Sequence, residues 1–216
     1  MLGGLPELSP LSAADVHDYL GQGGAVLDVR PASAFAAGHL PGAYGISTEA
    51  PLVTWAGWLI PFGTPLVLIF EGEAERREAV SQLIRIGYDN FRGYLDGGLA
   101  AWRRAGLLVE QVHLMDVGEL HRKLGRPGAP IVLDVRQDAE WEAGHIPGAM
   151  HIENGRLPYD NLPLPLDQPI AIHCQHHDRS TAGLSVLARR GYQQLELVDG
   201  GFAAWSDAGY EVEPGM

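Results

Sequence analysis

The sequence predicts an α/β protein made of two tandem copies of one domain, each a mainly parallel sheet with helices on both faces. The first observation is an internal repeat that keeps the same order in both halves. The second is the alternation of short apolar strands with helical segments in each half, which is typical of parallel α/β folds. The repeated segments are 27–30 with 133–136, 37–43 with 143–149, and 96–102 with 199–205. These matches place the copies at residues 1–110 and 111–216.

The expected elements follow one another in the same order in each copy. The first helix can begin after Ser12, whose hydroxyl can accept a first-turn N–H. The strands are apolar without alternation, as expected for strands covered on both faces. In chain order, with the residues of the first copy given before those of the second, the expected elements are a helix (12–20; 116–124), a strand (25–29; 131–135), a helical turn (32–37; 138–143), a central strand (65–70; 169–174), a helix (76–86; 180–189), a strand (90–94; 194–198) and a last helix with Ala-Ala-Trp. The stretch 107–115 is expected to be a linker.

Composition excludes several classes of protein. A formal net charge of −12 over 216 residues disfavours nucleic acid and anionic membranes as partners. A single cysteine excludes an intramolecular disulfide. The longest apolar stretch, around 55–62, is broken by Gly57 and Pro61 and is too short to span a bilayer. The N-terminus lacks the basic and apolar regions of a signal peptide. The sequence therefore predicts a cytoplasmic protein with no nucleic acid or membrane partner.

The candidate site is the loop that begins with Cys174, at the end of the second central strand. A strand-loop-helix junction directs backbone N–H groups toward one spot, which favours a thiolate or another anion there. Arg179 adds a cation at the start of the following helix. His173, His176 and His177 suggest zinc, but ligands so closely spaced cannot converge on one ion. No metal or cofactor is therefore expected.

The second copy contains four motifs: Asp-Val-Arg, Gly-His-Ile-Pro-Gly-Ala, a cysteine ending the central strand, and Asp-Gly-Gly-Phe-x-Ala-Trp. Taken together, and with their counterparts in the first copy, these motifs resemble the rhodanese (thiosulfate sulfurtransferase) family over nearly the whole chain. The resemblance implies that Cys174 carries sulfane sulfur as a persulfide, taken from thiosulfate or a low-molecular-weight persulfide. A thiol or cyanide would be the acceptor. The loop residues expected to hold the donor or stabilise the persulfide are Gln175, His176, His177, Asp178, Arg179 and Ser180.

Two alternatives remain open from the sequence. Cysteine phosphatases need a Cys-x5-Arg loop, whereas the arginine here follows in a Cys-x4-Arg loop that suits sulfur better than phosphate. Gln175 and His177 also depart from the family's Cys-Arg-x-Gly-x-Arg, and a left-handed backbone at His177 would be strained. A non-catalytic binding or regulatory module is therefore the main alternative to the sulfurtransferase.

The first copy lacks the residues of this chemistry. Phe70 stands at the position of Cys174, and Glu75 stands at that of Arg179. We therefore expect the first copy to be catalytically inactive. Its insert at 54–61 is similar to the paired rhodanese domains of bacterial metallo-β-lactamase-fold fusions, including persulfide dioxygenase-like proteins. That likeness makes a metallo-β-lactamase-fold protein or fused domain a candidate partner.

Overall fold

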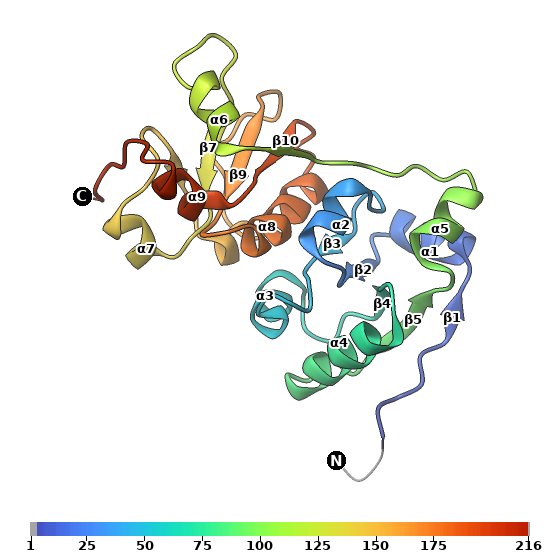
Figure 1. Ribbon diagram of the computed structural model, residues 1–216. Coiled ribbons are helices and arrows are strands. Elements are labelled where there is room, and N and C mark those ends of the chain that lie inside the picture. The colour runs from blue at the N-terminus through green and yellow to red at the C-terminus, as the bar shows by residue number, and fades with distance from the viewer. Residues whose placement is uncertain (1–3, 216) are drawn as a thin grey trace. The chain divides into compact units, whose positions relative to one another are not determined.

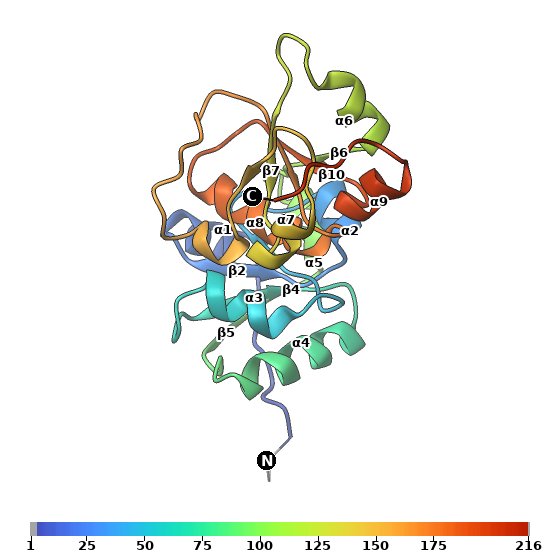
Figure 2. The same cartoon turned by 90° about the vertical axis from the view of Figure 1, so that its left-hand side faces the viewer.

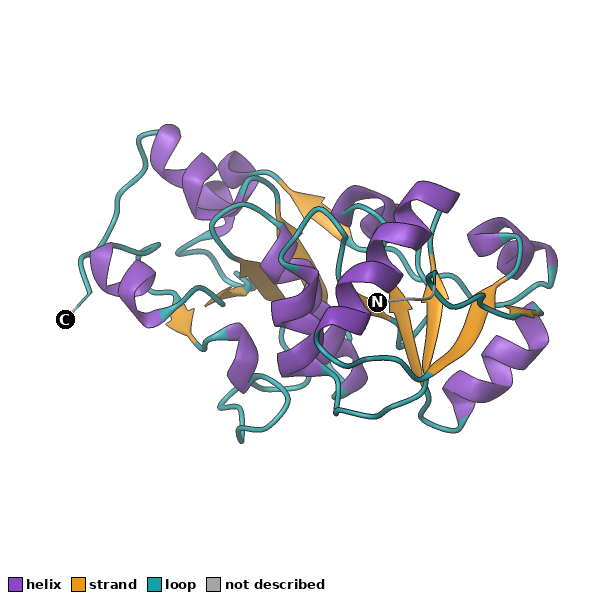
Figure 3. Cartoon of the chain, turned by 90° about the horizontal axis from the view of Figure 1, so that it is seen from below, coloured by secondary structure: helices purple, strands orange, loops and turns teal. Residues whose placement is uncertain are grey.

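The computed structural model describes residues 4–215 and consists of two compact units (Figure 1). The boundary between the units along the chain falls between Gln111 and Val112, one residue after the boundary placed from the sequence. Each unit holds its own five-stranded sheet, and all pairs of neighbouring strands are parallel (orange in Figure 3). The predicted tandem α/β architecture is confirmed.

The first sheet has the strand order β1-β5-β4-β2-β3. Its strands are β1 (Pro10–Leu11), β2 (Ala25–Asp28), β3 (Tyr44–Gly45), β4 (Leu66–Ile69) and β5 (Phe91–Leu95). The first unit's helices are α1 (Ala13–Gly21), α2 (Ala32–Ala37), α3 (Leu52–Leu59), α4 (Glu73–Arg85) and α5 (Gly98–Arg104). The central strand β4 is buried along its whole length.

The second sheet repeats this topology as β6-β10-β9-β7-β8. Its strands are β6 (His113–Met115), β7 (Ile131–Asp134), β8 (Met150–His151), β9 (Ile170–His173) and β10 (Leu195–Val198). The helices are α6 (Val117–Lys123), α7 (Asp138–Ala143), α8 (Asp178–Arg189) and α9 (Gly201–Asp207), with a 3-10 turn η1 (Asn154–Arg156). In both sheets the central strand therefore ends at the middle of the sheet's carboxyl edge.

Both faces of each sheet are covered, as expected. On one face of the first sheet, Val26 and Val67 pack with Val16 of α1 and Trp102 of α5. The side chains of successive strand residues alternate between the faces. Leu68 of β4 therefore points to the other face, and it is fully buried there. Helices α3 and α4 lie side by side in this unit (Figure 2). In the second unit Trp205 takes the place of Trp102 in the equivalent cluster.

Several elements differ from the prediction. The expected linker 107–115 contains β6, because His113–Met115 pair with β10 as the edge strand of the second sheet. The insert around 54–61, for which no element was predicted, contributes to helix α3, and this helix contacts α4. Helix α4 begins at Glu73, three residues before the predicted start. The cap at Ser12 is confirmed: its hydroxyl accepts the N–H of Asp15, whose carboxylate accepts the Ser12 N–H.

No helix within residues 4–215 is long and apolar enough to cross a membrane.

Candidate functional site

The loop that carries Cys174 lies between β9 and α8, at the carboxyl edge of the second sheet. Strand β9 runs between β10 and β7, so the loop stands at the sheet's centre. In open parallel α/β sheets this edge is where ligands bind. The burial of Cys174, 1% exposed, follows from its place directly after a strand that is buried on both faces.

The thiol faces the first turn of α8. Cys174 Sγ lies 3.7 Å from Ser180 Oγ, which itself donates to the carbonyl oxygen of His177 at 2.9 Å. Thr181 Oγ1 donates to the same carbonyl at 3.0 Å. His177 has φ −154°, a negative value, so the left-handed strain considered for this position does not arise. The loop therefore turns into α8 without a glycine at this position.

The loop's backbone N–H groups remain available. Within residues 4–215, none of the backbone N–H groups from Gln175 to Ser180 donates a hydrogen bond to another group of the chain. The next N–H group along the chain, that of Thr181, donates to His177 O. The first turn of any helix leaves its N–H groups without intrahelical partners. Such groups attract negative charge at a helix start. The geometry therefore suits an anion beside the thiol.

The start of α9 holds the loop from the other side. The Phe202 N–H donates to Cys174 O at 2.9 Å, and the Ala203 N–H donates to Gln175 O at 3.0 Å. Gly201 has φ +57°, and a Cβ there would lie 2.4 Å from Cys174 O. Only glycine fits that position, because a side chain would be both strained and in collision with the loop. The repeated Asp-Gly-Gly motif thus positions the cysteine.

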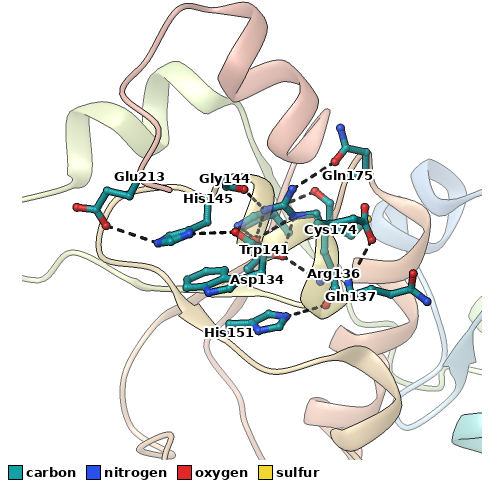
Figure 4. Close-up of polar contacts among 12 residues, drawn as sticks. Asp134, Arg136, Gln137, Trp141, Gly144, His145, His151, Cys174, Gln175 and Glu213 are labelled. Carbon is teal, nitrogen blue, oxygen red and sulfur yellow. Dashed lines mark hydrogen bonds and ion pairs between the residues drawn. The ribbon is translucent and has the colours of Figure 1, made fainter. Parts of the chain in front are cut away.

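Arg136 connects a buried ion pair to the loop (Figure 4). Its guanidinium is 2.7 Å from the Asp134 carboxylate and donates to Gly144 O, with both side chains buried. The Asp-Val-Arg motif thus forms a buried ion pair. Nη1 also reaches Gln175 Oε1 at 3.4 Å, and the Phe202 ring lies 3.9 Å from the guanidinium carbon. The sequence interpretation missed these two contacts.

Arg179 is held by Glu140 of α7. Two hydrogen bonds join the guanidinium to the carboxylate, at 2.5 and 2.7 Å. The bond to Glu140 raises the pKa of Arg179, and the nearby Cys174 adds to the rise. The same contact lowers the pKa of Glu140. Arg179 therefore keeps its charge beside Cys174 while Glu140 fixes its direction.

Glu140 was missed by the sequence analysis, although a signal for it exists. At the repeat offset of this region Glu140 corresponds to Ala34, while Arg179 corresponds to Glu75. The two positions therefore differ together between the copies, as expected for partners. Asn154 was also missed: it is 1% exposed and donates from Nδ2 to Arg179 O at 3.1 Å. It belongs to η1, in a stretch where the copies show no sequence match.

The remaining predicted residues form the outer part of the loop. The side chains of His176 and His177 are exposed, and those of Gln175 and Asp178 are half-buried. His177 Nε2 lies 3.7 Å from Asp178 Oδ1. Ser180 is fully buried against the thiol. The structure thus brings Cys174, Arg179 and Ser180 together and leaves the two histidines exposed on the outer side of the loop.

The corresponding loop of the first copy is built differently. Glu75 Oε2 accepts the Glu71 N–H at 2.6 Å, so a carboxylate of the chain itself occupies that donor. Burial raises the pKa of Glu75, and the nearby Glu71 adds to the rise. Phe70, in place of the cysteine, packs its ring 5.2 Å from that of Tyr94. This loop presents neither a nucleophile nor a cation.

Comparison with known proteins identifies the class to which this fold and loop belong. The pattern of the Rhodanese-like domain matches residues 12–105 and again residues 116–208. The chain therefore belongs to the rhodanese-like domain family, with two copies of the domain in tandem.

The chain is also similar to several individual proteins. Thiosulfate sulfurtransferase GlpE of Pseudoalteromonas translucida is 35% identical over 78 residues, which span 36% of this chain and 74% of the relative. A rhodanese-related protein from Thermoplasma volcanium is 29% identical, with a TM-score of 0.43, over 47% of this chain and 97% of its own. Thiosulfate sulfurtransferase from Pseudomonas aeruginosa is 23% identical, with a TM-score of 0.43, over 97% of this chain and 44% of its own.

Proposed function

We propose that the protein is a sulfurtransferase in which Cys174 carries sulfane sulfur as a persulfide. The observation that carries this proposal is the placement of Cys174 beside Arg179, at a loop whose backbone N–H groups are unused. Membership of the rhodanese-like family and the similarity to a thiosulfate sulfurtransferase support it. The donor is thiosulfate or a low-molecular-weight persulfide.

In the first step the Cys174 thiolate attacks the outer sulfur of the donor. With thiosulfate, the new Sγ–S bond forms as the S–S bond of the donor breaks, and sulfite leaves with the bonding electron pair. With a persulfide, a thiolate leaves in the same way. The terminal sulfur of the enzyme persulfide then carries the negative charge, which the N–H groups from Gln175 to Ser180 stabilise.

Arg179 holds the anionic donor or the leaving anion near the thiol. Glu140 acts as a positioning residue, because its two hydrogen bonds keep the guanidinium directed across the loop. Arg136 donates to the side-chain oxygen of Gln175 and thereby orients the first residue of the loop after Cys174. The buried thiol can be reached by a single sulfur atom more easily than by a bulky group.

In the second step the persulfide passes its outer sulfur to an acceptor. Cys174 is the only cysteine in the sequence, so no second thiol of the chain can resolve the persulfide. The acceptor is therefore external, a thiol or cyanide. Cyanide attacks the outer sulfur, thiocyanate leaves, and the Cys174 thiolate is regenerated.

Intact-mass measurement tests the proposal. The protein is incubated with thiosulfate or glutathione persulfide, and one added sulfur is expected on the wild type and none on Cys174→Ser. Cyanide should then remove the sulfur as thiocyanate in an equal amount. A wild type that stays unmodified with every donor would contradict the proposal. Hydrolysis of an aryl phosphate that depends on Cys174 would instead indicate a phosphatase.

A further inference from the structure

The first unit contains a cavity at the edge of its sheet that corresponds to the Cys174 loop. Its volume is about 410 Å³, within the range of small-molecule sites. The backbone around it comes from the end of β4, the end of β5 and the start of α5. Its lining comprises Arg30, Phe70, Glu71, Tyr94, Leu95 and residues 97–100. The proposed sulfur chemistry uses none of these residues.

The cavity exists because the last helix of the first copy does not close on the loop. In the second copy a Cβ at Gly201 would lie 2.4 Å from Cys174 O, whereas a Cβ at the equivalent Gly98 would lie 3.8 Å from Phe70 O. The Phe202 N–H bonds to the Cys174 carbonyl, but no such bond joins Leu99 to Phe70 within residues 4–215. Helix α5 therefore stands farther from its loop than α9 does.

The same difference uncovers a guanidinium. In the second copy the Phe202 ring stacks on Arg136 at 3.9 Å. In the first copy Leu99 replaces that ring, and no aromatic ring forms a cation–π contact with Arg30 in the part of the chain that the structure describes. Both Arg30 and Leu99 line the cavity. The cavity thus lies where the second copy stacks an aromatic ring on its arginine.

Arg30 is a rigid part of this cavity. It is 5% exposed, and Nε and Nη2 bond to Asp28 at 2.8 and 2.6 Å, with a further bond from Nη2 to Gly38 O. A guanidinium fixed in this way offers its plane for stacking at little entropic cost. The half-buried rings of Phe70 and Tyr94 add aromatic walls. A planar ring is therefore the group that the cavity accommodates best.

The charged groups around the cavity determine which substituent on the ring is favoured. Glu71 lines the cavity, and Glu75 lies beside it, hydrogen-bonded to the Glu71 N–H. Two carboxylates repel an anion and attract an ammonium group. Arg30 is already neutralised by Asp28. The preferred ligand is therefore an aromatic ring that bears a positive charge on a short arm.

We propose that the first copy binds a small aromatic amine in this cavity, with the ring stacked on Arg30 and the ammonium group near Glu71. The proposal is independent of sulfur transfer, because Cys174 and its loop take no part in it. It gives the copy that lacks the nucleophile a ligand site of its own.

Isothermal titration calorimetry on the full chain with three probes of one shape tests the proposal at pH 7. The probes are tyramine, which is cationic, tyrosol, which is neutral, and 4-hydroxyphenylacetate, which is anionic. Tyramine should bind at least threefold more tightly than tyrosol and at least tenfold more tightly than 4-hydroxyphenylacetate. Equal affinity for the three probes, or no binding of tyramine at millimolar concentration, would overturn the proposal.

Variants locate the site. Leu99→Phe supplies the missing ring from the chain itself, as Phe202 does, and should weaken tyramine binding at least tenfold. Leu166→Phe makes the same change at an exposed position of the second copy and should leave binding unchanged. Glu71→Gln, at an exposed residue, should remove most of the difference between tyramine and tyrosol. Unaltered binding in a folded Leu99→Phe, or an unaltered tyramine preference in Glu71→Gln, would show that the amine binds elsewhere.

Discussion

The two loops at the centres of the two sheets share a position in the fold but not a set of contacts. In the second copy α9 donates two backbone N–H groups to the loop carbonyls, and the loop's own N–H groups stay unused. In the first copy α5 makes no such bonds among the described residues, and Glu75 occupies the Glu71 N–H. The buried Asp-x-Arg ion pair is the same in both. The comparison teaches that the framework and the chemistry of this domain are separable.

The largest expected effect concerns the glycine against which the Cys174 loop packs. Gly201→Ala should destabilise the second unit by about 3 kcal/mol, because the new Cβ would meet Cys174 O at 2.4 Å. Gly98→Ala has the same kind of positive φ but no collision, so it should cost only about 1 kcal/mol. Hydrogen exchange resolved to peptides of each copy measures the loss of stability in both variants. Equal losses would mean that helix closure does not distinguish the copies.

The next largest effect is on the rate of persulfide formation, and it distinguishes Arg179 from Glu75, the equivalent residue of the first copy. Arg179→Ala should lower the second-order rate of persulfide formation about 100-fold, since a charged hydrogen-bond donor beside the reacting sulfur is lost. Glu75→Ala, the equivalent change in the first copy, should leave that rate unchanged. Stopped-flow or quenched intact-mass kinetics with thiosulfate gives both rates. A comparable loss in Glu75→Ala would contradict the assignment of the chemistry to one copy.

A pH effect is expected in the shared framework of the first copy. Burial lowers the pKa of His39 to about 4. The unfolded chain, with a histidine pKa of about 6.5, therefore binds more protons than the folded one between these values. This group's contribution is complete above about pH 6.5 and is lost as the pH falls toward 4. The loss between pH 7 and pH 5 should be about 2 kcal/mol.

Hydrogen exchange of first-copy peptides, corrected for the intrinsic rate, measures this loss. His39→Asn has no charge to gain and should show a flatter dependence between pH 7 and pH 5. An unchanged slope in His39→Asn would assign the effect to other groups.

The smallest effect tests Glu140 as a positioning residue. Glu140→Ala should slow persulfide formation about tenfold, which corresponds to about 1.4 kcal/mol, because Arg179 is then free to turn away from the thiol. Asp138→Ala removes an exposed carboxylate from the same helix and should have little effect. The double variant Glu140→Ala/Arg179→Ala should be no slower than Arg179→Ala. Additive losses would indicate a role for Glu140 that does not pass through Arg179.

The parts of the fold that repeat were predictable from the sequence, and so was the position of the cysteine. Apolar runs such as 66–69 and the capping residue Ser12 report local physics that the sequence displays directly. The edge strand β6 was not predictable, because three residues with two exposed side chains carry no strand pattern of their own. That strand exists because β10 offers it unpaired backbone groups.

The contacts around the loop were harder to predict for a similar reason. Glu140 and Arg179 are 39 residues apart in the chain, and neither residue type alone indicates the other. The ring of Phe202 covers Arg136 and its N–H donates to the Cys174 carbonyl, and nothing in the residue type indicates either contact. Such contacts arise from the packing of three elements at one point. Only the comparison of the two copies, in which both members of a pair change together, offers a sequence signal for them.

The carboxylate of Glu75 has one further consequence. Because it belongs to the same chain as the Glu71 N–H that it bonds, it is present at an effective concentration of about millimolar or more. A free anion in the surrounding solution must exceed that concentration before it can compete for the same donor. The first copy therefore behaves as a site occupied by a tethered competitor, and a sulfur donor below that concentration does not displace it.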